Sequence, residues 1–354
     1  MQLSILHPKS ICILRLSAIG DVCHAVAAVQ AIQNRHPEAK ITWVIGKVEA
    51  LLLQNLPNIE FIIFDKKAGL KGYQDLRQQL KNREFDILLH MQVAFRASLV
   101  ALCIRAKEKW GFDQSRAKEG QWLFTNRRIA PQIEPHVVDG FWGFAKAIGV
   151  SSDLTPVWKM PIADDDEKWC IEQTGSKAYI VISPAASKAE RNWLPENYAA
   201  VADYAIKNGL NVILSGGSTE MEEQLGEEIL KAILQTTQSS ITNLIGKTTL
   251  TQLLALLANA KLVLAPDSGP SHMASTVNTP VIGLYAHSNP KRTGPYNSQD
   301  TTVSIYESLL IKQTGKTIHE NPWGKRVKGE NLMKLISVES VIEKFDCLIK
   351  EQSG

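Results

Sequence analysis

The chain has 354 residues, of which 44% are hydrophobic and 21% are charged. This length suits two domains, and this composition is that of a globular protein rather than a disordered or fibrous one. No apolar run reaches the roughly 18 residues of a membrane span, and residues 1–16 lack the pattern of a signal peptide. We therefore expect a cytoplasmic protein, whose five cysteines, none in a CxxC pair, stay reduced.

The net charge of +3 conceals an asymmetry between the two halves. Residues 1–150 contain 20 Lys and Arg against 13 Asp and Glu, whereas residues 151–354 contain 19 against 23. The excess of basic residues in the first half indicates that this half binds an anionic partner. The basic stretches lack the aromatic residues that single-strand binders interleave with them. We therefore expect an anionic membrane surface or a phosphorylated acceptor as the partner, and no nucleic acid.

Short apolar runs alternate with amphipathic runs through the first half. The apolar runs predict buried strands over residues 10–16, 41–46, 60–65 and 85–91. Apolar spacings of three and four predict helices over residues 21–36, 48–55, 72–83, 95–106 and 136–150. Strands that alternate with helices predict a parallel sheet with helices on both faces.

The same pattern restarts after a polar linker, residues 151–166. Strands are predicted over residues 178–184, 211–217, 261–266 and 280–286, and helices over 197–209, 219–234, 251–260 and 269–277. We therefore predict an α/β protein of two doubly wound, Rossmann-like domains, residues 1–160 and 161–330, with ligands bound at strand carboxyl ends in a cleft. A last helix, within residues 331–354, could return to the N-terminal domain.

Three stretches resemble known sites but fail on spacing. Residues 245–250 contain Gly-Lys-Thr, yet a P-loop needs glycine where Ile241 stands. The acidic run 164–166 fits the first turn of a helix better than a metal site. Asp267, with a Ser and a His close behind it, lies within too short a stretch for a hydrolase triad. The chain also lacks GxSxG and GxGxxG motifs.

One loop of the second half suits a phosphate. Asp267 ends a predicted strand, and Ser268 and Gly269 then open a helix with His272 one turn inside it. Such a helix start presents free N–H groups and a positive dipole to an anion, and Gly allows close approach of the backbone. A plain capped helix is the alternative interpretation.

Two further loops follow predicted strands of the same sheet. One combines small side chains, including Ser187, with the cation Arg191, and the other has two glycines before Glu220. A carboxylate in such a loop can accept from ribose hydroxyls. Each loop is weak evidence alone, but together the three predict a pocket for a nucleotide diphosphate.

Four stretches together resemble the bacterial heptosyltransferases of lipopolysaccharide inner-core synthesis, glycosyltransferase family 9. They are residues 15–32, 183–198, 214–223 and 265–296. The resemblance covers nearly the whole chain and is looser between Phe64 and Pro135. It implies the GT-B arrangement of two Rossmann-like domains facing across a cleft. It also implies inverting transfer of heptose from ADP-heptose to a sugar of the lipid A–Kdo core, with no cofactor or obligatory metal, by an enzyme peripheral to the inner membrane.

The resemblance implies that Asp21 is the general base. Inverting displacement needs one base to take the proton of the acceptor hydroxyl. We expect Gly20 to let the chain turn so that Asp21 begins a helix, where the dipole favours its ionised form. A plain helix cap is again the alternative.

Four residues match the family at the donor phosphates. Arg191 matches a basic residue that holds the diphosphate, and an arginine can grip two oxygens. Ser187, Ser268 and Gly269 match residues that contact the phosphates.

Four more residues match around the rest of the donor. Glu220 matches the acidic partner of the ribose, and Asp267 and His272 match residues near the sugar and diphosphate. Thr248 falls in the loop that matches the adenine site, where other members of the family have Met. Of the donor contacts, the one to the adenine is therefore the least defined.

On the acceptor side we expect Lys118 to meet the anionic core sugar or its phosphate, with His24, Gln92 and Arg96 as neighbours. For His24, packing within a helix is an equal alternative. A different nucleotide sugar or acceptor, or a nucleotide-binding protein without catalysis, are the other functions that these motifs leave open. We expect a monomer.

Overall fold

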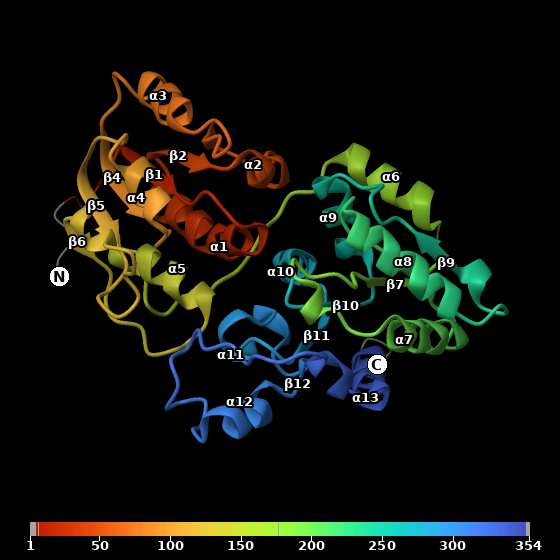
Figure 1. Cartoon of the computed structure of the whole chain (residues 1–354). Helices are drawn as coiled ribbons and strands as arrows, with labels where there is room; N and C mark the ends of the chain where they lie inside the picture. The colour runs from red at the N-terminus through yellow and green to blue at the C-terminus, as the bar shows by residue number, and fades with distance from the viewer. Residues whose placement is uncertain (1–4, 6, 176, 352–354) are drawn as a thin grey trace. The chain divides into compact units, whose positions relative to one another are not determined.

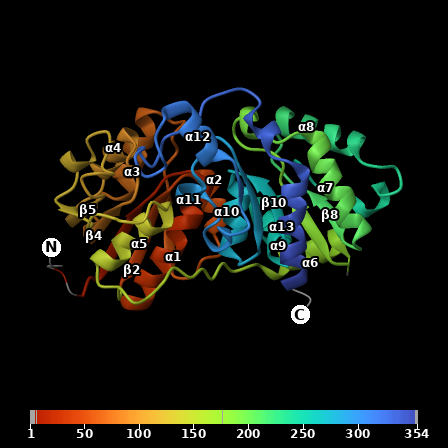
Figure 2. The same ribbon diagram turned by 90° about the horizontal axis from the view of Figure 1, so that it is seen from below.

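The computed structural model describes Ile5 and residues 7–175 and 177–351, and it divides into two compact units between Pro161 and Ile162. Each unit contains one parallel sheet with helices packed on it (Figures 1 and 2). The predicted fold class, α/β with two Rossmann-like domains, is confirmed. None of the helices in the described part of the chain combines the length and apolar content needed to cross a membrane.

The N-terminal unit has a six-stranded sheet in the order β3-β2-β1-β4-β5-β6. Its strands are β1 (Ser10–Leu14), β2 (Lys40–Ile45), β3 (Ile59–Ile63), β4 (Phe85–His90), β5 (Ala106–Gly111) and β6 (Arg127–Arg128). Its helices are α1 (Ile19–Arg35), α2 (Lys47–Leu53), α3 (Leu70–Gln79), α4 (Phe95–Ala101) and α5 (Val137–Ala147), with a 3-10 turn at Gln121–Leu123.

Helices cover both faces of this sheet because its central strands are apolar on both sides. Ile11 through Leu14 of β1 have no exposed surface. Cys12 and Leu14 share a core with Leu76 of α3 and Ala97 of α4. Helices α1 and α5 pack together on the opposite face. All strands are parallel, so their carboxyl ends lie along one edge.

The C-terminal unit repeats this topology, with strand order β12-β11-β10-β7-β8-β9. Its strands are β7 (Tyr179–Ile182), β8 (Asn211–Leu214), β9 (Ile241–Asn243), β10 (Val263–Pro266), β11 (Val281–Tyr285) and β12 (Val303–Ser304). Its helices are α6 (Asp164–Thr174), α7 (Pro195–Lys207), α8 (Glu220–Ala232), α9 (Leu250–Asn259), α10 (Gly269–Thr276), α11 (Pro290–Thr293), α12 (Tyr306–Thr314) and α13 (Val338–Glu351).

The C-terminal helix α13 packs within the second unit, whereas the sequence had left open a return to the first. Val341, Phe345 and Leu348 lie in the core formed by β7, β8 and α7. The ring of Tyr204 on α7 meets Phe345 edge-on at 5.5 Å, and its hydroxyl donates to Asp346 at 2.8 Å. The apolar face of α13 is therefore needed to cover this sheet.

The sequence pattern missed strands β5, β6, β9 and β12 and helices α11 and α12. Residues 95–106, predicted as one helix, form α4 and then turn into β5. Charged residues concealed β5. Glu108 on this strand is buried because Arg127 pairs with it at 3.3 Å and the indole N–H of Trp110 donates to it at 2.9 Å. Partners for a buried charge cannot be recognised from periodicity.

The stability of a Phe345 variant tests whether α13 is part of the core of the second unit. Phe345 is 1% exposed, so Phe345→Ala should lower the free energy of unfolding by about 3–5 kcal/mol. Leu335→Ala removes a side chain that is 61% exposed and should change it by less than about 0.5 kcal/mol. Denaturant titration followed by far-UV circular dichroism measures both. Equal effects of the two variants would contradict the placement of α13.

His90 should make the protein sensitive to acid. Burial lowers the pKa of this imidazole on β4 to about 3, with Lys109 and Arg15 contributing. The unfolded chain binds a proton below about pH 6.5 while the folded chain does not. Stability present above that pH is therefore lost as pH falls from about 6.5 towards 3, by up to about 1.4 kcal/mol per unit.

The variant His90→Gln should flatten this dependence, because a glutamine does not titrate. It can still bond the Ser98 hydroxyl that His90 contacts at 3.2 Å, which favours a folded variant. Free energies of unfolding at neutral pH and at about pH 5 measure the effect. His319→Gln, at an exposed site, is the control and should keep the wild-type slope. If His90→Gln kept it as well, the neutral buried imidazole would be ruled out.

Candidate active site

The loop between β1 and α1 places Asp21 beside a buried arginine. The guanidinium of Arg15 pairs with Oδ2 of Asp21. It also donates to the carbonyl of Met91 at 2.8 Å and lies over the ring of Phe141, 5.3 Å from the centroid. Arg15 therefore ties the end of β4 and the face of α5 to the helix that carries Asp21.

The two oxygens of the Asp21 carboxylate are used unequally. Oδ2 accepts from Arg15 and, at 3.3 Å, from the backbone N–H of Ala18. Oδ1 accepts from no residue in the described part of the chain. The side chain is 36% exposed. Oδ1 is thus the oxygen available to a ligand hydroxyl.

Two local expectations about this loop were wrong. Helix α1 begins at Ile19, so Asp21 is its third residue rather than its first. Gly20 lies inside helix α1, and the N-cap of this helix is Ala18, whose backbone is extended. Ala18 has no side chain that can cap, so Asp21 reaches back to its N–H instead. Asp21 still lies in the first turn, where the helix dipole favours an anion.

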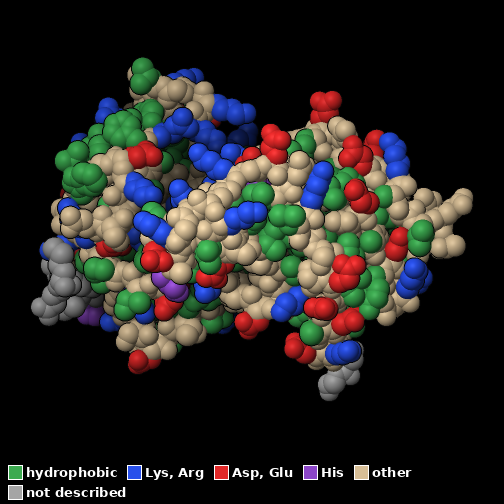
Figure 3. Space-filling view, turned by 60° about the horizontal axis from the view of Figure 1, so that its bottom comes forward, with side chains coloured by type: hydrophobic (Ala, Val, Ile, Leu, Met, Phe, Trp, Pro, Cys, Tyr) green, Lys and Arg blue, Asp and Glu red, His purple; other side chains and the backbone are tan. Residues whose placement is uncertain are grey.

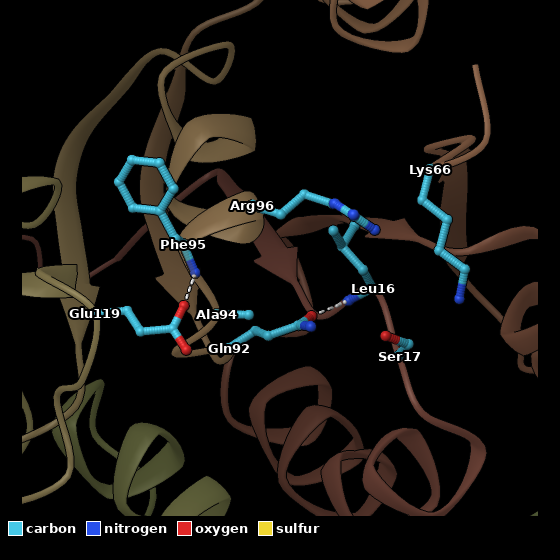
Figure 4. A pocket seen from close by; sticks show the side chains of 8 residues that line it. All are labelled: Leu16, Ser17, Lys66, Gln92, Ala94, Phe95, Arg96 and Glu119. Carbon is cyan, nitrogen blue, oxygen red and sulfur yellow. Dashed lines mark hydrogen bonds between the residues drawn. The ribbon is translucent and has the colours of Figure 1, made fainter. Parts of the chain in front are cut away.

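A cavity of 340 Å³ opens at the same sheet edge, beside the Asp21 loop. Its lining is Leu16, Ser17, Lys66, Gln92, Ala94, Phe95, Arg96 and Glu119 (Figure 4). Lys66 and Arg96 extend into it from different elements, one after β3 and the other on α4. Glu119 accepts from the backbone N–H of Phe95 at 2.6 Å. Two cations against one engaged carboxylate favour an anionic ligand.

The structure treats the four predicted acceptor residues differently. Gln92 and Arg96 line the cavity, and Oε1 of Gln92 accepts from the Leu16 N–H at 2.7 Å. Lys118 is exposed, next to the lining residue Glu119. His24 is 3% exposed and its ring meets His136 edge-on at 5.5 Å, as in the packing alternative.

In the C-terminal unit, Asp267 follows β10 and joins residues from three other segments. Oδ2 lies 3.8 Å from the guanidinium of Arg191 and accepts from the hydroxyl of Ser288 at 2.7 Å. Oδ1 lies 3.8 Å from Nε2 of His272. The structure therefore brings the predicted residues Arg191, Asp267 and His272 together. Ser288, which follows β11, was not predicted.

Electrostatics at this cluster favour ionised Asp267. Burial opposes the charge, but His272, Ser288 and Arg191 outweigh it, so the pKa of Asp267 lies below its usual value. Burial and the nearby cation Arg326 lower the pKa of Arg191, and the carboxylates of Asp267 and Glu190 offset only part of this. The Arg191 guanidinium is thus held in a largely buried position where its charge is not fully stabilised, which suits an anionic ligand.

Donor atoms without partners mark where such a ligand fits. Nε of Arg191 and Oγ of Ser268 are buried, and neither has a hydrogen-bond partner among the described residues. Ser268 is the N-cap of α10, which starts at Gly269, so the free N–H groups of this helix are close by. Buried unpaired donors are costly unless a ligand satisfies them. A phosphate accepts from all of these groups.

The other predicted donor residues follow other strands at the same edge of this sheet, Ser187 and Thr248 on loops and Glu220 as the first residue of α8. Ser187 follows β7, Glu220 follows β8, and Thr248 follows β9. Ser187 and Glu220 are exposed, and Thr248 is half-buried. No contact given for the described residues joins these three to the Asp267 cluster.

The loop after β8 is closed by Glu222, a residue that was not predicted. Its carboxylate accepts from the N–H of Gly217 at 2.9 Å and from the hydroxyl of Thr219 at 2.7 Å. The Thr-x-x-Glu spacing, a helix-capping signal, could have identified it. A similar signal at Thr249, the N-cap of α9, explains the Gly-Lys-Thr stretch as a helix start.

Lys66 and Glu119 at the cavity were also missed, because no motif marks isolated charged residues in irregular segments. Among the residues that the structure describes, no three His, Cys, Asp or Glu side chains are grouped so as to hold a metal ion.

Known proteins resemble this chain along most of its length. The model of glycosyltransferase family 9 (heptosyltransferase) matches residues 73–322. The lipopolysaccharide core heptosyltransferase OpsX of Haemophilus influenzae is 51% identical over 336 residues, which are 95% of each chain.

Two solved structures share the fold. A family 9 glycosyltransferase from Veillonella parvula has a TM-score of 0.79 at 22% identity and covers 98% of both chains. The ADP-heptose lipopolysaccharide heptosyltransferase II of Escherichia coli has a TM-score of 0.75 at 23% identity and covers 98% of this chain and all of that one. Family match, sequence identity and fold agree, and the chain belongs to glycosyltransferase family 9, the heptosyltransferases.

Proposed function

We propose that this enzyme transfers heptose from ADP-heptose to the Kdo–heptose inner core of lipopolysaccharide, with inversion and with Asp21 as general base. The observation that carries the proposal is the 51% identity, over 95% of both chains, to a lipopolysaccharide core heptosyltransferase. The free Oδ1 of Asp21 beside a cationic cavity adds a chemical reason.

In the proposed step, Oδ1 of Asp21 takes the proton of the acceptor hydroxyl. The acceptor oxygen forms a bond to the anomeric carbon as the bond from that carbon to the diphosphate breaks, and ADP leaves with the electron pair. Arg15 fixes Oδ2 and so aims Oδ1. The Asp21 carboxylate would also stabilise the positive charge that builds on the sugar in the transition state.

The donor diphosphate is proposed to bind at the start of α10. Arg191 and Ser268 there offer buried donors without partners, and Gly269 leaves the backbone N–H groups accessible. Asp267 and His272 hold Arg191 and the adjoining loop in place.

The outer loops supply the remaining donor contacts in this proposal. Ser187 reaches the phosphates, Glu220 the ribose and Thr248 the adenine, all from the carboxyl edge of the same sheet. No metal or cofactor takes part.

The acceptor is proposed to occupy the cavity next to Asp21. Lys66 and Arg96 would pair with its carboxylate or phosphate groups, and Gln92 and Lys118 lie at or beside the lining. His24 is a support for α1 rather than a contact in this proposal, given its burial. We propose that the enzyme acts as a monomer at the cytoplasmic surface of the inner membrane, where a lipid-linked acceptor would be available.

Replacement of the proposed base should stop heptose transfer but leave ADP binding unchanged. Asp21→Asn keeps the size of the side chain but cannot take a proton, so kcat should fall by about 10²–10⁴. ADP release from ADP-heptose with Kdo–lipid A, or with a heptosylated acceptor, measures transfer, while calorimetry measures ADP binding. Asp75→Asn, on exposed α3, is the matched control. Near-normal transfer by folded Asp21→Asn would refute the assignment.

Substitution of two cations in the loop after β7 tests the proposed diphosphate site. Arg191 is 11% exposed and lies beside Asp267, whereas Lys188 is 63% exposed and pairs only loosely with Glu190, at 3.8 Å. Arg191→Ala should weaken ADP binding by about 10–100-fold, because a buried charged hydrogen bond to phosphate is lost. Lys188→Ala should change it by about twofold or less. Titration calorimetry with ADP decides, and equal effects would move the site elsewhere.

A further inference from the structure

Helix α4 presents an apolar stripe to solvent. Phe95, Leu99 and Leu102 lie at positions i, i+4 and i+7 and so share one side of the helix. Phe95 is 52% exposed and Leu102 is 55% exposed, while Ala97 and Val100 fill the core on the other side. The helix is therefore apolar on both sides, which the packing of this unit alone does not require.

A second exposed apolar segment adjoins the stripe. Trp122 and Leu123 lie in the 3-10 turn after Glu119 and are 48% and 76% exposed. The next residue, Phe124, meets the ring of Phe95 edge-on at 6.2 Å. We call Phe95, Leu102, Trp122 and Leu123 the α4 face.

Cations border the α4 face. Arg96 follows Phe95 on the helix, and Lys118 precedes Glu119, whose carboxylate bonds the Phe95 N–H. Lys66 shares the cavity with Phe95 and Arg96. In Figure 3, apolar and basic side chains gather next to each other over the N-terminal unit, at the upper left. The one carboxylate named here, Glu119, is already engaged, so the border is basic.

We propose that the α4 face is the surface by which this enzyme docks on an anionic lipid bilayer. The proposal rests on the proposed function, which supplies a lipid-linked acceptor, and it adds the residues that meet the membrane. Exposed Leu and aromatic side chains insert into the interface, and basic residues beside them attract anionic headgroups. Attachment is stronger when both signals act together, and the apolar α4 face with its basic border combines them.

The cavity supports a bilayer rather than another protein as the partner. Phe95 belongs to both the α4 face and the cavity lining, so the cavity opens at the edge of the docking face. A sugar attached to a membrane-embedded lipid would reach Lys66 and Arg96 without leaving the surface. An acceptor drawn from solution would not need an apolar border there.

The test uses vesicle co-sedimentation of the full chain with phosphatidylglycerol–phosphatidylethanolamine vesicles and with phosphatidylcholine vesicles. We expect binding to the anionic vesicles, weakened by salt, and little to the neutral ones. The double variant Leu102→Glu/Leu123→Glu should bind the anionic vesicles about tenfold more weakly. Leu154→Glu, at a leucine of the same unit that is 57% exposed, should bind like the wild type.

Transfer activity separates this proposal from the proposed function. Both charged positions of the double variant lie outside the catalytic residues, so transfer to a delipidated, soluble core acceptor should stay within about twofold of wild type. Transfer to acceptor embedded in vesicles should fall with binding. Wild-type vesicle binding by the folded double variant, or no binding of the wild type to anionic vesicles, would overturn the docking face. Absence of all transfer by the wild type would instead refute the proposed function.

Discussion

The pairing of Arg15 with Asp21 organises the carboxyl edge of the sheet in the N-terminal unit. One guanidinium, 11% exposed, joins the end of β1 to the carbonyl after β4, to the ring of Phe141 on α5 and to Asp21 on α1. Two of the three guanidinium nitrogens are engaged, one by the Met91 carbonyl and one by Asp21, whereas the buried Nε has no partner among the described residues. Loss of the Asp21 carboxylate would therefore leave a buried cation without its counter-charge. The position of the Asp21 carboxylate is thus a consequence of how the unit packs.

The C-terminal unit also has an acid after a central strand, held by an arginine, but with the opposite outcome. Asp267 is 12% exposed, and its two oxygens face Arg191, Ser288 and His272. Asp21 is 36% exposed and keeps one oxygen unused by the described residues. A carboxylate with both oxygens occupied and a lowered pKa is a poor proton acceptor. The same fold thus leaves a carboxylate oxygen available in one unit, where the base is proposed, and forms a fixed counter-charge in the other.

The sequence allowed prediction of those parts whose cause is local. Unbroken apolar runs such as Ile11–Leu14 predicted the central strands, and the apolar spacing over residues 197–209 predicted α7 to within two residues at each end. The loop after β10 was recognised because Asp267, Ser268 and Gly269 are adjacent in the chain. Signals of this kind need no knowledge of distant residues.

Other parts depended on partners far along the chain. Strand β5 contains Glu108, which is tolerated only because Arg127 lies beside it across the sheet. Ser288 and Lys66 have no motif, and topology alone brings them to Asp267 and to the cavity. The start of α1 was predicted too late because Gly20 suggested a turn before the helix. The chain instead enters the helix at the extended residue Ala18, which is the N-cap. Long-range packing decides such cases, and periodicity does not record it.

The charges around Arg191 in the second unit favour the proposed diphosphate over a neutral ligand. Arg326 lies close enough to lower the pKa of Arg191, and the next residue, Val327, donates its N–H to the carbonyl of His287 at 3.0 Å. His287 precedes Ser288, which bonds Asp267, so this backbone pairing holds the Arg326 segment next to the loop that contacts Asp267 and Arg191. A bound dianion would turn this repulsion into attraction. A neutral ligand would leave both the repulsion and the unpaired donors of Arg191 and Ser268 in place.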